Sequence, residues 1–307
     1  MNKNVLIIGL GKQGKKYISY LEKYNLYLFD QNKKILKKFK KKYKIINNLN
    51  NFLLNNNVDI CIVATPTYTH ENIIIKLSEF NIKILCEKPI FSFKKKIDKL
   101  LRNKHVIKNS KNIYCGYIFR ASKQIQVFRK KTQQLLKLNK IDYAFLYLSG
   151  TGGHAPWKHN TIQGGGVTNE ITSHLIDLSY YIFGKPLKIK ICHEKKIRFN
   201  RYYKSKKKKI KTNSNDTNYL NFIYKNIDVF IKTDFLSKKV FNFMISSGHN
   251  NYLRTSITDK NLNYNINNYD NDFYHSQIKD LMKKKPKFLH RFADSILLHK
   301  LMSYLLK

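Results

Sequence analysis

Short apolar runs alternate with helical spacing through the first 120 residues. The runs lie at positions 5–9, 26–29, 58–64, 82–86 and 113–117. Apolar residues between them recur at helical spacing, at positions 17–21, 35–39, 73–80 and 97–106. Unbroken apolar runs are typical of strands that are buried on both faces of a sheet. Strands that alternate with helices predict a parallel, doubly wound sheet.

The pattern changes after about residue 120. Helical spacing at 125–136 is followed by alternation at 143–148, a glycine-rich loop at 150–166, and a long helix at 167–183 that ends at Gly184-Lys185-Pro186. Period-two strands then fill 187–266, including 219–224 and 227–233 around a tight Lys225-Asn226 turn, before closing helices at 273–282 and 288–306. We therefore predict an α/β protein with two domains. Residues 1–120 form a Rossmann domain with a doubly wound parallel sheet, and residues 121–307 form an α+β domain with an open, mostly antiparallel sheet.

The charge of the chain raises the question of a nucleic-acid partner. The 59 Lys and Arg against 19 Asp and Glu give a formal net charge of +40, and such charge neutralises phosphates. Only seven of the 59 are Arg, although Arg is the residue that most often reads bases. Lys is enriched together with Asn, Ile, Tyr and Phe, as in a genome rich in A and T. We therefore expect a small-molecule partner and no nucleic acid.

Neither a membrane segment nor a disulfide framework is predicted. No apolar run reaches the roughly 18 residues that cross a bilayer, and positions 5–10 are too short for a signal-peptide core. We expect a cytoplasmic protein with no membrane partner. Cys61, Cys86, Cys115 and Cys192 stand singly in apolar segments, which predicts buried, reduced thiols and no metal site.

A glycine motif follows the first predicted strand. Gly9-Leu10-Gly11-Lys12-Gln13-Gly14 has the spacing G-x-G-x-x-G, opens a helix, and is followed about 20 residues later by Asp30 at the end of the next strand. The loop and the helix N-terminus, with Lys12 and Gln13, suit a pyrophosphate. Asp30 would accept hydrogen bonds from the ribose and would favour NAD over NADP, although Lys33 and Lys34 could neutralise a 2′-phosphate.

A lysine follows a later strand of the same predicted sheet. The strand at 82–86 leads into Glu87-Lys88-Pro89, at the carboxyl end of a parallel strand where doubly wound folds bind ligands. At this point the chain resembles the glucose-fructose oxidoreductase/inositol dehydrogenase (Gfo/Idh/MocA) family. The matching segments, in order, are the glycine motif, Ala64-Thr65-Pro66 with His70, Cys86-Glu87-Lys88-Pro89, Gly116-Tyr117 with Arg120, and Gly164-Gly165-Gly166 with His174 and Asp177.

The resemblance implies roles for several of these residues. Thr65 and Pro66 would line the dinucleotide cleft together with His70 and Glu87. Lys88 would lie beside the nicotinamide and the reacting hydroxyl. Arg120 is similar to an arginine at the start of the family's substrate domain, where substrate binding and a salt bridge are both open. The family also implies a homo-oligomer, a dimer or a tetramer.

The predicted helix at 167–183 would supply the proton-transfer group. Glu170, His174 and Asp177 are spaced so that they share one helical face. Removing a hydride from a secondary alcohol requires a base for the hydroxyl proton, and an imidazole suits that role near neutral pH. Glu170 stands where the family usually has Asp, so it could reach the substrate, orient His174 or serve the local network. Asp177 could act directly or hold a basic group.

The loop before the triple glycine contains His154, Trp157, Lys158 and His159. These residues could close over a polyol, with Trp157 stacking on a sugar face. We therefore predict an oxidoreductase that moves a hydride between NAD, or NADP, and a carbon of a sugar, polyol or sugar derivative. Lys88 and His174 would be the catalytic groups. Two alternatives stay open: a nucleotide-sugar oxidoreductase of surface polysaccharide synthesis, and a cofactor-binding sensor without catalysis.

Overall fold

A computed structural model describes the chain at residues 3–91, 97–150, 156–195, 200–203, 208–211, 214–235, 241–247, 250–256 and 272–305. The chain divides into two compact units. The first comprises Met1–Tyr117 and Gln277–Leu297, and the second comprises Ile118–Ser276 and Leu298–Lys307. No helix among the described residues is long and apolar enough to cross a membrane.

The first unit is built on a seven-stranded sheet in the order β15-β6-β5-β4-β1-β2-β3. Its strands are β1 (Asn4–Ile8), β2 (Asn25–Phe29), β3 (Lys44–Ile45), β4 (Ile60–Val63), β5 (Lys83–Cys86), β6 (Ile113–Cys115) and β15 (His290–Arg291). All neighbours are parallel except β15, which runs antiparallel to β6. The predicted doubly wound sheet is confirmed.

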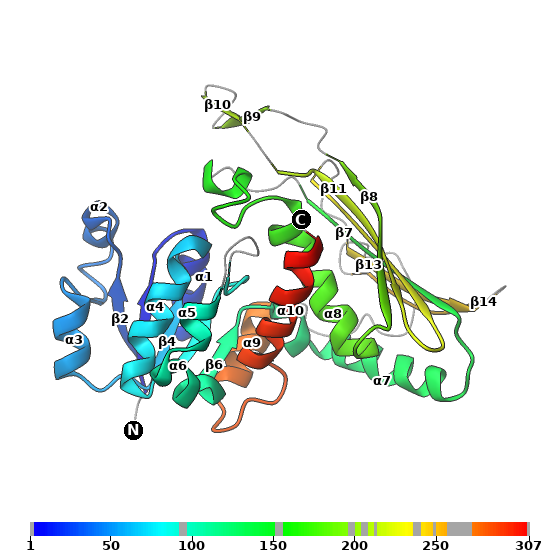
Figure 1. Cartoon of the computed structure of the whole chain (residues 1–307). Coiled ribbons are helices and arrows are strands. Elements are labelled where there is room, and N and C mark those ends of the chain that lie inside the picture. The colour runs from blue at the N-terminus through cyan, green and yellow to red at the C-terminus, as the bar shows by residue number, and fades with distance from the viewer. Residues whose placement is uncertain are drawn as a thin grey trace. The chain divides into compact units, whose positions relative to one another are not determined.

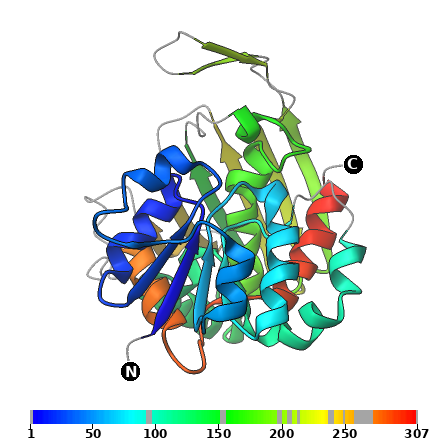
Figure 2. The same ribbon diagram turned by 90° about the vertical axis from the view of Figure 1, so that its left-hand side faces the viewer.

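Helices cover both faces of this sheet, which explains why β1 is apolar and buried after Asn4 and why β4 is apolar and buried throughout. The helices are α1 (Lys12–Leu21), α2 (Lys33–Lys37), α3 (Leu49–Asn55), α4 (His70–Leu77), α5 (Asp98–Leu101) and α6 (Lys104–Asn109). The chain moves outward from β1 to β2 in one direction and from β4 to β5 in the other. Because both crossovers are right-handed, α1 and α4 lie on opposite faces, as Figure 2 shows.

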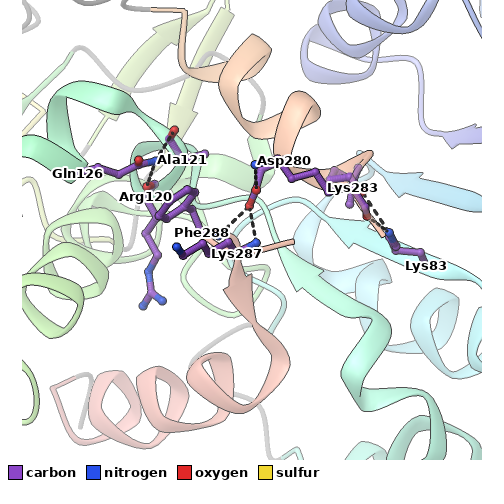
Figure 3. A network of polar contacts seen from close by, with 9 residues as sticks. Lys83, Arg120, Ala121, Gln126, Asp280, Lys283, Lys287 and Phe288 are labelled. Carbon is purple, nitrogen blue, oxygen red and sulfur yellow. Dashed lines mark hydrogen bonds and ion pairs between the residues drawn. The ribbon is translucent and has the colours of Figure 1, made fainter. Parts of the chain in front are cut away.

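Residues Gln277–Leu297 belong to the first unit, whereas the sequence pattern placed them in the second domain, and only Leu298–Lys307 of the closing segment belongs to the second unit. The predicted helix at 288–306 is shorter than expected, because residues 290–291 form β15 and α10 begins only at Phe292 (Phe292–Leu305). The turn before β15 is held by Asp280 of α9 (Phe273–Leu281), whose buried carboxylate accepts the amides of Lys287 and Phe288 (Figure 3).

The predicted helix at 97–106 is also divided. α5 ends at Leu101 and α6 begins at Lys104. The Asn103 side chain caps α6 by accepting hydrogen bonds from the amides of His105 and Val106. An Asn that caps its own following turn competes with continuation of the preceding helix. The prediction of a single helix over 97–106 from the apolar spacing is therefore wrong.

The second unit contains a six-stranded sheet in the order β14-β13-β7-β12-β11-β8 and a two-stranded ribbon. The strands are β7 (Tyr143–Ser149), β8 (Lys188–Lys195), β11 (Thr217–Ile223), β12 (Asp228–Asp234), β13 (Phe241–Ser247) and β14 (Asn250–Ser256), with β9 (Asn200–Tyr203) and β10 (Lys208–Lys211) in the ribbon. Within the described strands of this sheet, β12 and β7 pair in parallel and the other neighbours pair antiparallel, so the predicted open, mostly antiparallel sheet is confirmed. The tight turn at Lys225-Asn226 is confirmed by the bond from Tyr224 N–H to the Ile227 carbonyl.

Helices cover one face of this sheet. α7 (Lys123–Lys137) and α8 (Ser173–Phe183) lie on the same side in Figure 1, and the inward residues of β7 and β12 are buried while alternate residues are less so. The edge strand β8 has little cover, which corrects one expectation. Cys192 on β8 is exposed, whereas Cys61, Cys86 and Cys115 are buried as predicted.

Candidate cofactor and catalytic site

Three of the predicted cofactor residues, Gly9, Asp30 and Glu87, lie in one row at the carboxyl ends of the strands of the first unit. The last strand residues pair in register across the sheet, as Phe29, Ile8, Val63, Cys86 and Cys115. The ladder continues one residue further, because Gly9 donates to the Phe29 carbonyl and Glu87 donates to the Val63 carbonyl, at 2.9 and 2.8 Å. The next residues therefore form a second row, which comprises Asp30, Gly9, Ala64, Glu87 and Gly116. Each begins or belongs to one of the segments identified in the sequence.

The three glycines of the loop differ in what a side chain at their position would contact. Gly9 has φ +92°, and a Cβ there would lie 2.8 Å from the Ala64 carbonyl. A Cβ on Gly14 would lie 1.9 Å from the Gly9 carbonyl oxygen, so α1 packs on the loop backbone at a distance that only glycine allows. A Cβ on Gly11 would meet nothing within 4 Å. The loop is thus closed at its two ends and open at its middle glycine.

The open side of the loop lies at the start of α1, which suits a dinucleotide. Gly11 is the N-cap of α1 and has no side chain that could cap the helix. The first-turn amides, including those of Lys12 and Gln13, stand at this end of the helix. Together with the positive end of the helix dipole they favour a phosphate. A cradle with a bare glycine facing open space fits the pyrophosphate of NAD.

Asp30 is held against the same loop. One carboxylate oxygen accepts the Leu10 amide at 2.7 Å and the other accepts the Asn32 amide at 2.8 Å. Asn32 in turn caps α2 by accepting the Lys34 amide. Asp30 therefore fixes the glycine loop, and each oxygen keeps lone-pair capacity for a ribose hydroxyl. The role of Asn32 as a cap was missed, although an Asn just before a helix is a recognisable signal.

His70 lies behind the cofactor edge rather than at its surface. Its side chain is fully buried, with Nδ1 3.0 Å from the Pro89 carbonyl and Nε2 2.9 Å from the Thr65 carbonyl. Burial lowers the pKa of His70, while hydrogen bonding to the Thr65, Pro89 and Ile90 backbone partly opposes this. The imidazole thus joins the Thr65-Pro66 turn to the Lys88-Pro89 turn.

Lys88 follows a buried acid. The Glu87 side chain is 8% exposed, and its carboxylate accepts the Tyr17 hydroxyl of α1 at 2.8 Å. The Tyr17 oxygen also lies 3.1 Å from the amide of Gln277, which is 260 positions away. This contact joins α1 to α9, and no local sequence signal indicates it. Glu87 therefore contacts protein groups, while Lys88 is half-buried one residue further along the loop.

In the second unit, Arg120 and Asp177 form a buried bidentate pair. Arg120 Nε donates to Asp177 Oδ2 at 3.0 Å and its Nη2 lies 2.5 Å from Oδ1, with side chains 10% and 1% exposed. Gln126 supports this corner from α7 by donating to the Ala121 carbonyl at 3.0 Å (Figure 3). Of the alternatives left open by the sequence, the geometry favours a salt bridge for Arg120 and a basic partner for Asp177.

His174 lies at the start of α8, which continues from a π turn over Thr168–Thr172. The wider turn corrects the expectation of one regular helix at 167–183, because Ser173 N–H bonds to the Thr168 carbonyl five residues back. The His174 ring packs edge-on against Phe119, with centroids 4.9 Å apart. The π turn changes the rotation between Glu170 and His174 about the helix axis.

Glu170 forms an ion pair with Lys158 of the preceding loop. The Lys158 ammonium also lies 5.0 Å from the centroid of the Trp157 ring. Two of the loop residues that were candidates for covering a substrate, Trp157 and Lys158, are thus linked through Glu170 to the π turn that precedes α8. His154 lies outside the described residues. Among the described residues, no group of three or more His, Cys, Asp or Glu side chains could hold a metal ion.

Comparison with known proteins agrees with this geometry. Compared by sequence with curated proteins, the chain matches none. Among solved structures, a myo-inositol dehydrogenase from Corynebacterium glutamicum is 12% identical, with 100% of this chain and 96% of that chain covered and a TM-score of 0.77. The WlbA dehydrogenase from Bordetella pertussis, in complex with NADH and UDP-GlcNAcA, is 15% identical, with coverage of 99% and 95% and a TM-score of 0.77. A probable dehydrogenase from Thermotoga maritima is 16% identical, with coverage of 97% and 94% and a TM-score of 0.75.

At these identities the structures show a shared fold. Residues 3–117 also match the oxidoreductase family GFO_IDH_MocA, described as having an NAD-binding Rossmann fold. The matched range is the part of the first unit that contains the glycine loop, Asp30 and Glu87-Lys88-Pro89. Residues 3–117 of the chain therefore match the NAD-binding Rossmann domain of the Gfo/Idh/MocA oxidoreductase family.

Proposed function

We propose that the protein moves a hydride between NAD and a hydroxyl-bearing carbon of a sugar, polyol or sugar derivative. The observation that supports this most is the row of residues at the carboxyl ends of the parallel strands, which contains Asp30 and Gly9 as neighbours and Glu87 two strands from Gly9. This row lies at the point where the chain leaves β1 in one direction and β4 in the other, which is the ligand-binding edge of doubly wound sheets.

In this proposal the first unit holds and orients the cofactor. The amides at the start of α1 bind the pyrophosphate, and Asp30 accepts hydrogen bonds from the adenosine ribose. Thr65 and Pro66 line the cleft, and His70 keeps their turn in register with Lys88 from behind. NAD, when bound, accepts or supplies the hydride.

Lys88 and His174 do the proton chemistry in this proposal. In the direction of oxidation, His174 takes the hydroxyl proton of the substrate while the Lys88 ammonium stabilises the developing negative charge on oxygen. In the direction of reduction, the Lys88 ammonium first polarises the carbonyl group of the substrate. The His174 imidazolium then supplies the proton to the oxygen as the hydride is transferred to the carbon.

Glu170 and Asp177 act through other residues rather than on the substrate. Asp177 lies on α8, three residues after His174, and forms an ion pair with Arg120. This ion pair anchors the helix close to His174. Glu170 holds Lys158 and, through it, the Trp157 loop. We assign both acids to positioning, with Trp157 and Arg120 as the residues they position.

Two substrate classes follow from the structural neighbours. A free polyol is favoured by the likeness to a myo-inositol dehydrogenase, and a nucleotide sugar is favoured by the likeness to a WlbA structure that contains UDP-GlcNAcA. An assay of NADH absorbance against a panel of polyols, sugar acids and nucleotide sugars separates the two. A homo-oligomer and a cytoplasmic location stay predictions.

The catalytic assignment is tested with Lys88→Met and His174→Asn. Each should lower kcat by roughly 2 to 4 orders of magnitude, the usual range for acid-base groups, while NADH binding stays within a few-fold of the original. Lys99→Met, an exposed lysine on α5, is the matched control and should leave kcat unchanged. Full turnover in either variant would remove that residue from catalysis. NADH binding without turnover on any substrate would favour the sensor alternative.

A further inference from the structure

A separate cavity lies in the first unit, at the outer edge of its sheet. It has a volume of about 730 Å³ and is lined by residues of α5, α6, the segment that enters β6, β15 and the first turns of α10. Lys111 and Asn112 stand where the chain enters β6. The amino ends of parallel strands face the edge opposite to Gly9 and Glu87, so this cavity is distinct from the cofactor site.

The cavity has an apolar wall. Leu100 and Val106 from the helices and Phe292 from α10 are buried side chains that line it, and Ile107, which is 57% exposed, extends the wall outward. An apolar hollow of this volume falls within the range of small-molecule sites. It would bury the hydrocarbon or aromatic part of a ligand.

Cations surround this apolar wall. Lys111, Lys284, Lys285 and Arg291 line the cavity, and among the residues that the structure describes none of those lining it is Asp or Glu. Arg291 is paired with Tyr114 across β15 and β6, so its strand position is fixed by the sheet. The arrangement combines one apolar surface with several positive charges.

The nearby acids are already bound to protein groups. Asp280 accepts two backbone amides and the Lys283 ammonium, and Asp294 accepts the amide of Arg291. Burial raises the pKa of the Tyr114 phenol, Arg291 lowers it and Asp280 raises it. The Tyr114 hydroxyl therefore keeps its proton at neutral pH and can donate a hydrogen bond to an anion.

We propose that this cavity binds an amphipathic organic anion, with its apolar body against Val106 and Phe292 and its negative group among Lys111, Arg291 and Tyr114. The ligand class is a phosphate, sulfate or carboxylate on an acyl chain or an aromatic body. Neither part of such a ligand would suffice alone. Inorganic phosphate lacks the buried area, and an uncharged alcohol lacks the charge-assisted hydrogen bonds.

The test uses the full chain saturated with NADH and dodecyl phosphate below its micelle concentration, with binding measured by calorimetry. We expect saturable binding, with dodecanol and inorganic phosphate each at least about tenfold weaker, the effect of roughly 1.4 kcal/mol. Lys111→Gln and Arg291→Gln should each weaken dodecyl phosphate about fivefold or more. Lys108→Gln removes the same charge from α6 outside the lining and should leave affinity within about twofold.

A filling variant checks the location without disturbing the core. Ala293 lines the cavity yet is exposed on α10, so Ala293→Trp occupies the space while the fold is retained, as circular dichroism can verify. It should abolish dodecyl phosphate binding and leave the NADH affinity unchanged. The proposal is overturned if dodecyl phosphate does not bind, if dodecanol binds equally well, if Lys108→Gln weakens binding as much as Lys111→Gln, or if Ala293→Trp has no effect. Because NADH binding is measured separately, these results do not depend on the proposed catalysis.

Discussion

The glycine loop gives two substitutions that are chemically identical and should behave in opposite ways. In Gly14→Ala the new Cβ would lie 1.9 Å from the Gly9 carbonyl oxygen, so α1 would have to move by more than 1 Å. Alanine normally stabilises a helix interior by about 1 kcal/mol over glycine. Here overpacking against backbone, typically about 1–3 kcal/mol and greater where nothing can yield, outweighs that gain. We expect a net loss of about 2 kcal/mol in the free energy of unfolding, together with loss of NADH binding.

Gly11→Ala should leave the fold intact. Gly11 has φ −68°, which alanine accepts, and the new Cβ meets nothing within 4 Å. The free energy of unfolding should stay within about 0.5 kcal/mol, as for other open surface sites. The methyl group enters the space proposed for the pyrophosphate, however, so the Kd for NADH should rise about tenfold or more, which is about 1.4 kcal/mol.

The two variants are compared by urea unfolding and by calorimetric titration with NADH. The reasoning about helix packing fails if Gly14→Ala is as stable as the original protein. The assignment of the phosphate site fails if Gly11→Ala binds NADH with unchanged affinity. A stability loss in Gly11→Ala alone would contradict both points, because it would mean that the open side of the loop is in fact packed.

Three further outcomes follow from the hydrogen bonds of the site. Asp177→Asn leaves the Arg120 guanidinium buried without its countercharge, so thermal unfolding should show a loss of about 3–5 kcal/mol. Its pH–rate profile should keep its shape, and a shifted profile would indicate a direct catalytic role. Asp30→Ala should lower the ratio of kcat/KM for NAD over NADP about tenfold, and an unchanged ratio would exclude Asp30 from ribose binding. Because the pKa of His70 is lowered from its ordinary value of 6.5, the unfolded chain binds its proton first, and stability should fall as pH drops from about 7 to about 5. Urea unfolding of His70→Gln should show a weaker dependence over that range, and an identical dependence would refute this account.

Two of the expected helices differ from the structure in their local backbone hydrogen bonds. The helix expected over 97–106 was divided by the Asn103 cap, and the helix expected over 167–183 begins with a π turn. Both regions have apolar residues at helical spacing, and that spacing alone cannot specify which backbone amides bond to which carbonyls. The burial expected for Cys192 failed because β8 is an edge strand, a position that is set by strand order.

The sequence by itself determined five of the seven strands in the first unit's sheet and the residues at their carboxyl ends, but not β3 and β15. Unbroken apolar runs identify strands covered on both faces, and parallel strands bring their carboxyl ends to one edge, so Gly9, Asp30 and Glu87 could be grouped before any coordinates were known. Only the tertiary structure decided which distant polar side chains form hydrogen bonds and ion pairs with one another. The Tyr17 hydroxyl forms a hydrogen bond with the Gln277 side chain, which is 260 positions away in the sequence. Arg120 forms an ion pair with Asp177. Such contacts depend on how distant helices pack, and neither period nor spacing along a chain records which polar groups are buried together.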